Sequence, residues 1–282
     1  MRRFGVLVAL VVVLAAAPAS AQTILGTTGM GTTTSTLVEI DPVTGGLLNT
    51  IGPVGYVVNG LTWDASSGTL FATTSANDPT FGSGLITIDP LTGVGTPIGT
   101  GHGLGSGASV TAASNSAGQV FSWWDPNEDD LLLYDTTTGL ATRIGESSLS
   151  TGAHGLAFNP ADVLYLVNSD SNVYTINTTT GATTLVGNLA LSNFAHHGDF
   201  DPSTGLYFGI DQTSTGPKNL VVADLSAFSV VNTLPTVADL HTLTFYGGAL
   251  VAVDVPTVSP WGAALMTLLL VVAGGFLLRR VM

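Results

Sequence analysis

One short pattern recurs along the chain and constrains its fold more than any other feature. Each copy is an alternating strand, a turn that opens with Asp or Asn, and a return strand that ends in Gly, although the fifth copy is less complete. The turns begin at Asp41, Asp89, Asp135, Asn177 and Asp224, which lie 42 to 48 residues apart. Asp and Asn close such a turn on their own backbone, and Gly accepts a positive φ before the return strand. A period of about 40–50 residues made of short strands predicts a β-propeller.

A second kind of hairpin lies between these copies. Its first example runs from Gly60 to Asp64, turns through Gly68 and returns from Leu70 to Thr73. Because the two kinds alternate, we expect each unit to be a four-stranded antiparallel blade, with four complete units between Gly60 and about Leu234.

The fifth blade is expected to come from both ends of the body. The first hairpin, 37–52, lacks an inner partner, and the last half-unit, 241–254, lacks an outer one. Joining them would remove the exposed sheet edges. A surplus strand at 24–28 competes with 250–253 for one place, so a ring with an incomplete sixth blade is the alternative. A β-sandwich fits less well, because it does not require this period.

Charge and composition limit what the protein binds. Charged residues make up 9% of the chain, there is no Cys, and the formal net charge is −13. Four of the six Lys and Arg residues lie at the chain ends. The body therefore carries only Arg143 and Lys218 as Lys or Arg, against all nineteen Asp and Glu residues. Nucleic acid binding requires Lys and Arg to displace counterions, so we expect none.

The N-terminus has the pattern of a secretory signal peptide. Arg2 and Arg3 precede an apolar run from Phe4 to Ala17, and Ala19-Ser20-Ala21 forms an Ala-x-Ala cleavage site. We therefore predict a signal peptide over 1–21 and an exported β-propeller over 22–254. A retained membrane anchor is the alternative.

The C-terminus predicts a transmembrane helix over 262–282. An apolar run from Gly262 to Leu278 is followed by Arg279 and Arg280. Its length of roughly 25 Å is just enough for a thin hydrocarbon core. Trp261 stands where an interfacial aromatic belongs, and the Arg pair would stay in the cytoplasm, which leaves the body outside the inner membrane.

The segment before this helix resembles the IPTL-CTERM sorting signal of Gram-negative bacteria, Ile-Pro-Thr-Leu-Ser-Glu-Trp-Gly. Here the sequence is Val-Pro-Thr-Val-Ser-Pro-Trp-Gly, and Val255, Val258 and Pro260 depart from the signal. The matching residues are Pro256, Thr257, Ser259, Trp261 and Gly262. Like the related PEP-CTERM signals, the resemblance implies that an exosortase-type membrane protease recognises 255–261, cuts nearby and passes the protein to the cell surface. A plain tail anchor is the alternative.

Aligning the innermost strands on their aromatic residues reveals a column of polar residues. Four residues before the aromatic stand Asn59, His154, His196 and His241, and the second unit, which lacks the aromatic, has Ser109 in this place. Imidazoles from three successive blades would suit Zn²⁺ or a similar divalent ion. We therefore predict a metal or ligand site from the three histidines, with Asn59 and Ser109 on the same rim. The alternative is that these histidines cap strand entries or bond channel water.

Two further residues are candidates for binding or catalysis. Trp123 and Trp124 alternate, so we expect Trp124 to be exposed and able to stack on a sugar, although packing between blades is the commoner role. Asp199 places a carboxylate where other inner strands have Ala157 or Thr62. A catalytic site would combine Asp199 with His196 and His241.

These features predict an exported, surface-sorted propeller that acts as a non-catalytic binding or matrix-associated module. No Gly-x-Ser-x-Gly or His-Glu-x-x-His motif is present. The alternative is an enzyme acting on extracellular polysaccharide through a His/Asp site at the channel mouth. A purely structural surface protein is a third possibility and predicts no pocket.

Overall fold

The computed structural model describes residues 22–29, 31–105, 107–125, 130–147, 149, 154–191, 194–212 and 218–248. Among these, the side chains of Glu146, Phe194, Ala195, His196 and Gln212 are not described. The described residues all belong to one compact unit, Met1–Gly248, and form strands and turns without a helix. They contain no helical segment able to span a membrane. The predicted signal peptide, sorting motif and C-terminal helix lie outside the described residues.

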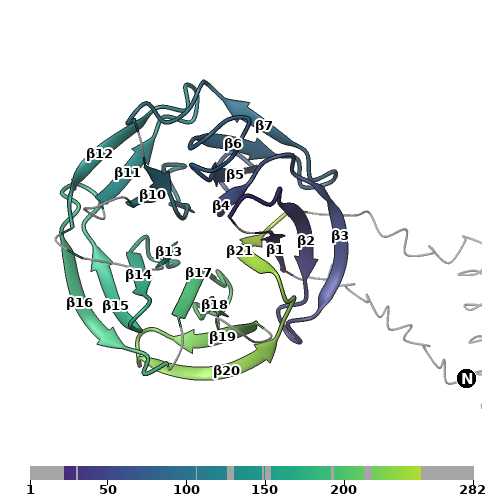
Figure 1. Ribbon diagram of the computed structural model, residues 1–282. Helices are drawn as coiled ribbons and strands as arrows, with labels where there is room; N and C mark the ends of the chain where they lie inside the picture. The colour runs from purple at the N-terminus through teal and green to yellow at the C-terminus, as the bar shows by residue number, and fades with distance from the viewer. Residues whose placement is uncertain are drawn as a thin grey trace, which may run out of the picture. The chain divides into compact units, whose positions relative to one another are not determined.

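Five antiparallel sheets form a closed ring (Figure 1). Blade I contains β4 (Val58–Asp64), β5 (Thr69–Thr74), β6 (Leu85–Ile88) and β7 (Gly95–Ile98). Blade II contains β8 (Ala108–Ser109), β9 (Ala113–Ser114), β10 (Val120–Asp125), β11 (Asp130–Tyr134) and β12 (Ala141–Glu146). Blade III contains β13 (His154–Phe158), β14 (Leu164–Asn168), β15 (Asn172–Ile176) and β16 (Thr183–Asn188). Blade IV contains β17 (Phe194–Phe200), β18 (Tyr207–Gln212), β19 (Asn219–Asp224) and β20 (Ser229–Pro235).

Blade V joins the two ends of the body. Its order is β21 (Leu240–Tyr246), β1 (Thr23–Thr28), β2 (Thr36–Ile40) and β3 (Leu47–Pro53), with β21 innermost in the ring (Figure 1). Across the closure, the hydroxyls of Thr27 and Thr242 lie 2.7 Å apart. The five-bladed fold is therefore confirmed. The surplus strand takes the second place in the blade as β1, while its competitor at 250–253 lies outside the described residues.

Blade II departs from the expected inner strand. Instead of one strand over 110–113, two short strands, β8 and β9, pair with opposite ends of β10. Gly60 of blade I explains why the backbone can lie so close here, since a Cβ on Gly60 would meet the backbone of Thr111 and Ala112. The interrupted strand leaves the Thr111 carbonyl free of the ladder, and the hydroxyl of Ser122 donates to it at 2.5 Å.

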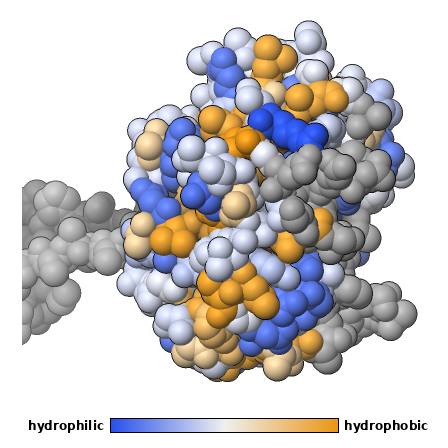
Figure 2. All heavy atoms as spheres, turned by 90° about the vertical axis from the view of Figure 1, so that its left-hand side faces the viewer, coloured by the Kyte–Doolittle hydropathy of each residue, from blue (hydrophilic) through white to orange (hydrophobic). Residues whose placement is uncertain are grey.

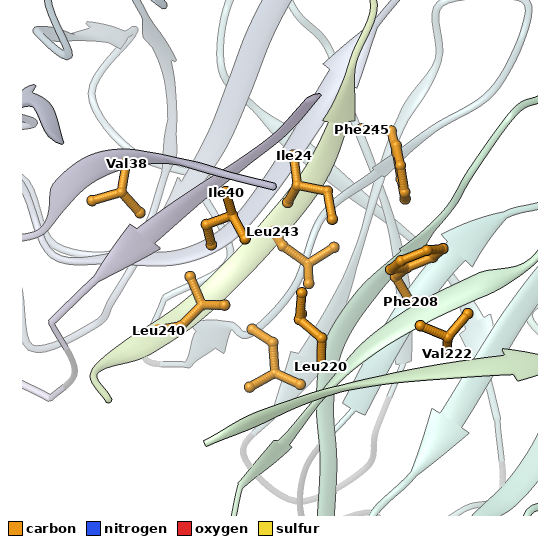
Figure 3. Close-up of a cluster of buried hydrophobic side chains, with 10 residues drawn as sticks. Ile24, Val38, Ile40, Phe208, Leu220, Val222, Leu240, Leu243 and Phe245 are labelled. Atoms are coloured by element: carbon orange, nitrogen blue, oxygen red, sulfur yellow. The ribbon is translucent and has the colours of Figure 1, made fainter. Parts of the chain in front are cut away.

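Neighbouring blades pack through buried apolar side chains. The cluster between blades IV and V includes Phe208, Leu220, Leu243 and Phe245 (Figure 3), with the rings of Phe208 and Phe245 meeting edge to face at 5.0 Å. Equivalent clusters join blades I and II, II and III, and III and IV. Because the sequence has no cysteine, this apolar burial, at about 25 cal/mol per Å², is the main force holding the ring closed.

The outermost strands contribute little to these clusters. β3, β16 and β20 are mostly exposed along their lengths. Figure 2, which views the side of the ring where β16 lies, shows hydrophobic residues in separate groups among hydrophilic ones. Leu185 and Val186 of β16 are 57% and 37% exposed. The core therefore lies between the inner three strands of each blade.

The turn chemistry that defines the repeat is present in full. In the first copy the amide of Val43 donates to Oδ1 of Asp41 at 2.8 Å, and Gly45 adopts a φ of 74°. The corresponding glycines at 93, 139 and 181 also have positive φ. In the fifth copy Phe228 takes this place, with a φ of 49°.

The glycine that ends each copy has a different role. In the first three copies it lies against the backbone of the turn in the next blade, whereas Gly187 of the fourth copy lies against the ring of Phe228. A Cβ on Gly93 would lie 2.6 Å from the carbonyl oxygen of Gly52, and a Cβ on Gly181 would lie 2.7 Å from that of Gly145. Real Cβ atoms do not approach so closely, so the two glycines of the repeat are what let successive blades come together.

Candidate functional site

A cavity of about 190 Å³ lies where the innermost strands end. Its lining includes the last or next-to-last residue of an inner strand from every blade: Trp63, Ser114, Phe158, Phe200 and Phe245. The C-terminal ends of five inner strands can meet in one cavity only if all of these strands run in the same direction along the channel axis. The cavity is therefore the mouth of the channel at one face of the ring, and we call it the mouth cavity.

The aromatic residues of the mouth are also part of the packing between blades. The ring of Phe158 lies 5.4 Å from that of Phe121, and the ring of Phe200 lies 5.4 Å from that of Tyr165. Both Phe158 and Phe200 are less than 10% exposed. They therefore present only a small part of their surface to the cavity. Blade II has Ser114 in this column, which leaves one side of the mouth without an aromatic.

Asp199 lines the same cavity and binds the neighbouring blade. Its Oδ2 accepts hydrogen bonds from the Thr244 hydroxyl at 2.8 Å and from the Phe245 amide at 2.9 Å. Its Oδ1 accepts from the Phe200 amide at 2.8 Å. Burial raises the pKa of Asp199 to about 6, although these three bonds oppose the shift. Asp199 is thus a desolvated carboxylate that titrates near neutral pH.

A hydrogen-bonded belt continues from Asp199 around the mouth. The Thr244 hydroxyl accepts from the Trp63 amide at 3.0 Å, which connects blade V to blade I. The Ser114 hydroxyl donates to the Trp63 carbonyl at 2.9 Å, which connects blade I to blade II. The mouth is therefore held rigidly by polar contacts across three successive blade boundaries.

The turn after β13 supplies two more polar groups. Asp162 accepts hydrogen bonds from the amide and hydroxyl of Ser116, which ties blade III to blade II. Asn159 uses its Oδ1 to accept from the amides of Ala161 and Val163 at 3.0 and 2.9 Å. Its Nδ2 makes no hydrogen bond to any described residue, so two N–H donors remain available beside the cavity that Asn159 lines.

A second cavity, of about 230 Å³, adjoins the first between blades III and IV. Asn159 and Phe200 line both cavities. The other lining residues of the second cavity are Tyr165, Thr204, Gly205, Leu206, Asp224, Leu225 and Ser226. No Lys or Arg lines either cavity, so both present acceptors and apolar surface without positive charge.

The predicted histidine column belongs to the opposite ends of the inner strands. His154 begins β13 and is buried beside Trp123, at 6.2 Å between rings. His241 is buried in β21, and its Nδ1 lies 3.1 Å from the Val58 carbonyl, to which it donates. The side chains of the described residues include no group of three His, Cys, Asp or Glu placed to hold a metal. Because the side chain of His196 is not among them, the metal site stays a prediction.

The neighbour of His241 is His197. A bulge between His196 and Gly198 makes His197 an extra residue in β17, and its ring lies 4.8 Å from that of His241. Lys218 is nearby, with its Nζ donating to the Leu240 carbonyl at 2.6 Å. Burial is the main cause that lowers the pKa of His241 to about 4. This end of the channel thus contains His197, His241 and Lys218, together with Asp239, whose charge acts on Lys218.

The remaining candidates have clear structural surroundings. Ser109 is fully buried, with its hydroxyl 2.5 Å from that of Tyr134. Trp124 is half-buried in blade II, packs beside Gly107, and has the Arg143 guanidinium 5.9 Å from its ring. Asn59 is half-buried at a bulge of β4. None of these three lines the mouth cavity. Asp199 bonds to Thr244 and Phe245, while His241 bonds to Val58, so the two have separate partners.

Sequence comparisons find no match for the chain. No family model matches it, and no curated protein does either. The evidence from relatives is therefore structural only.

Solved structures share the fold at low sequence identity. TolB from Acinetobacter baumannii superposes with a TM-score of 0.50 at 15% identity, over 78% of this chain and 55% of TolB. A protein of unknown function from Bacteroides caccae gives a TM-score of 0.45 at 15% identity, over 77% of this chain and 73% of that one. The chain thus spans about half the length of TolB. The likeness to TolB agrees with a β-propeller and, at this identity, extends no further than the fold.

Proposed function

We propose that the protein is an exported, non-catalytic binding module that holds an extracellular polysaccharide at the mouth cavity. The observation that carries this proposal is a cavity built from all five blades, whose lining includes aromatic side chains, the carboxylate of Asp199 and the side-chain amide of Asn159. Sugars offer hydroxyl groups to such polar atoms and apolar C–H groups to aromatic surfaces.

The bonding of Asp199 supports binding over catalysis. Its two oxygens already accept three hydrogen bonds from the protein, two of them from the next blade. A carboxylate that exchanged protons in each turnover would weaken this connection each time. Rigid, pre-formed groups instead favour recognition, because they lose little entropy when the ligand binds.

One observation favours an enzyme as the second candidate. A carboxyl group with a pKa of about 6 in a cavity is a typical general acid, and Asp162 provides a second carboxylate in the same lining. Hydrolysis of a glycosidic bond needs two such groups. This candidate predicts turnover that depends on Asp199.

One experiment separates the two functions. The full chain, purified in detergent, is incubated with a panel of soluble polysaccharides, and binding and new reducing ends are both measured. We expect retention of a polysaccharide without cleavage. Release of reducing ends that is abolished by Asp199→Asn would establish the enzyme instead, and failure to retain any polysaccharide would overturn the binding proposal.

Export and sorting form a separate part of the proposal. The signal peptide at 1–21 would bring the body across the inner membrane. An exosortase-type protease would then act at 255–261 and release the body from the helix at 262–282. Replacing Pro256 and Trp261 with Ala should leave the full-length protein in the inner membrane, as followed by fractionation and immunoblotting. Equal release of this variant and the wild type would argue for a plain anchor.

A further inference from the structure

We infer that the mouth cavity and its neighbour are adjoining subsites for two consecutive sugar units of a polysaccharide without acidic groups. This inference rests on the proposed binding function and deepens it by defining the ligand. We call them the mouth subsite and the lateral subsite.

The first argument is size and continuity. The volumes of about 190 and 230 Å³ are each smaller than the roughly 300 Å³ at which pockets for drug-sized ligands begin. Each cavity therefore has room for a single ring-sized unit. Because Asn159 and Phe200 line both, a linear ligand can pass from one cavity to the other without leaving the surface.

The second argument is the set of polar atoms in each subsite. The mouth subsite has Asp199, whose Oδ1 accepts a single hydrogen bond from the part of the chain that the structure describes. The lateral subsite has Asp224, which accepts from Ser226 and Ala227 through Oδ1 alone. Oδ2 of Asp224 has no hydrogen-bond partner among the described residues. Each subsite thus keeps a carboxylate oxygen that can accept from a ligand hydroxyl.

Asn159 adds the complementary donors at the boundary. Its Oδ1 is occupied by the turn, which fixes the side chain, and its Nδ2 hydrogens remain for a ligand. A sugar hydroxyl both donates and accepts, so hydroxyls near the link between two sugar units can bond to a carboxylate and to this amide together. The apolar groups beside them are Phe200, Leu206 and Leu225.

The third argument is charge, which defines the class of sugar. Asp162, Asp199 and Asp224 line the two subsites, and no Lys or Arg does. Hydrogen bonds from Ser226 lower the pKa of Asp224, which favours its charged form. A sugar acid would be repelled and its carboxylate left unpaired. Neutral and amino sugars fit.

Calorimetric titration of the full chain in detergent tests the inference. The probes are cello-, manno- and chito-oligosaccharides of one to four units, with oligogalacturonate as an acidic comparison and spermidine as a cation without a sugar. We expect a disaccharide of at least one series to bind about tenfold more tightly than its monosaccharide, with little further gain for longer chains. Oligogalacturonate and spermidine should not bind.

Two isosteric variants assign the subsites. Asp224→Asn keeps the oxygen that closes the turn, as Asn177 does in blade III, and should remove the gain from the second sugar while monosaccharide binding is unchanged. Asn159→Asp keeps its turn but loses both donors and adds a charge, so it should weaken monosaccharide and disaccharide alike by about tenfold or more. Asn177→Asp makes the same chemical change in a turn that lines neither cavity and is the matched control. Thermal unfolding verifies that all three variants fold.

The possible outcomes separate failure of the two-subsite inference from failure of the proposed binding function. Equal affinity for one and two units, or no effect of Asp224→Asn, would overturn the two-subsite arrangement but leave binding at the mouth. Sugar binding that is unchanged by Asn159→Asp, or no binding of any sugar, would overturn the proposed function as well. Preference for oligogalacturonate or spermidine would overturn the class of ligand.

Discussion

The carbonyl oxygen of Gly145, in the last strand of blade II, lies against the Cα hydrogens of Gly181, in the outer turn of blade III. A Cβ on Gly181 would come within 2.7 Å of that oxygen. The same contact joins Gly52 to Gly93. Blades therefore meet through bare backbone at their outer strands, in addition to the apolar clusters of their inner strands.

Replacing Gly181 with Ala should destabilise the protein through two effects. Its φ of 75° costs an L-residue about 1–2 kcal/mol, and the clash with Gly145 adds a further cost of about 1–3 kcal/mol. Gly205 is a matched control, because its φ is 72° and a Cβ there would have no atom within 4 Å. Urea unfolding of both variants measures the difference. Equal losses of unfolding free energy would mean that the junction itself contributes nothing.

Asp199 should make the protein more stable as the pH falls from about 6 to 4. Its pKa in the folded state, about 6, is above the ordinary value of 3.8, so the folded protein binds the extra proton in this window. Stability then decreases with rising pH, by up to about 1.4 kcal/mol per pH unit. Asp199→Asn should remove this slope, which unfolding curves from pH 4 to 7 would reveal. An unchanged slope in the variant would contradict the shifted pKa.

His241 should have the opposite effect on stability over nearly the same pH range. Burial and the nearby charge of Lys218 both lower its pKa, to about 4 from the ordinary 6.5. The unfolded chain therefore binds the proton first, and the contribution of His241 to stability is lost as the pH falls from 6.5 towards 4. His241→Asn can keep a donor for the Val58 carbonyl and should flatten this loss. EDTA in every sample excludes a metal at the predicted histidine site as the cause.

Tyr207 and Gly155 should be strongly coupled. The Tyr207 hydroxyl is buried between β13 and β17, has no hydrogen-bond partner among the described residues, and would overlap a Cβ on Gly155. Gly155→Ala should therefore cost about 1–3 kcal/mol. In the Tyr207→Phe background the cost should shrink, because the nearest ring carbon is 3.2 Å from that Cβ. A double-mutant cycle on the free energy of unfolding gives the coupling, and additive effects would contradict this packing.

The repeat in the sequence was sufficient to predict a β-propeller, but it left five and six blades both open. The turns at Asp41, Asp89 and Asp135 recur at a period typical of a ring of blades, and the missing halves at the two ends predict a shared blade. The glycine at the end of each copy was visible as part of the pattern. The role of this glycine could not be predicted, because the atom that would clash with a Cβ there belongs to a turn more than 30 residues away in the sequence.

The candidate site was only partly predictable. Aligning the inner strands on their aromatic residue singled out the histidines, which lie near the start of those strands, whereas the aromatic residues themselves line the mouth. Asp199, which stood out as a charge in an inner strand, does line it. Asn159 and Asp162 were missed because they look like ordinary turn residues, and a cavity that they share with Phe200 appears only when blades meet. The bulge at His197 was also hidden, since an extra residue in a strand leaves no mark in a single sequence.

The shared blade also sets an order on folding. β1 pairs with β21, which is the last strand among the described residues, so blades I to IV can form while the inner edge of β1 still has no partner. An unpaired edge invites pairing with another chain. A nascent chain that stalls before Tyr246 therefore exposes β1, near the N-terminus of the body, as a strand with an unpaired edge. Aggregation during biosynthesis should depend on how soon β21, a strand of seven residues, is synthesised and pairs with β1.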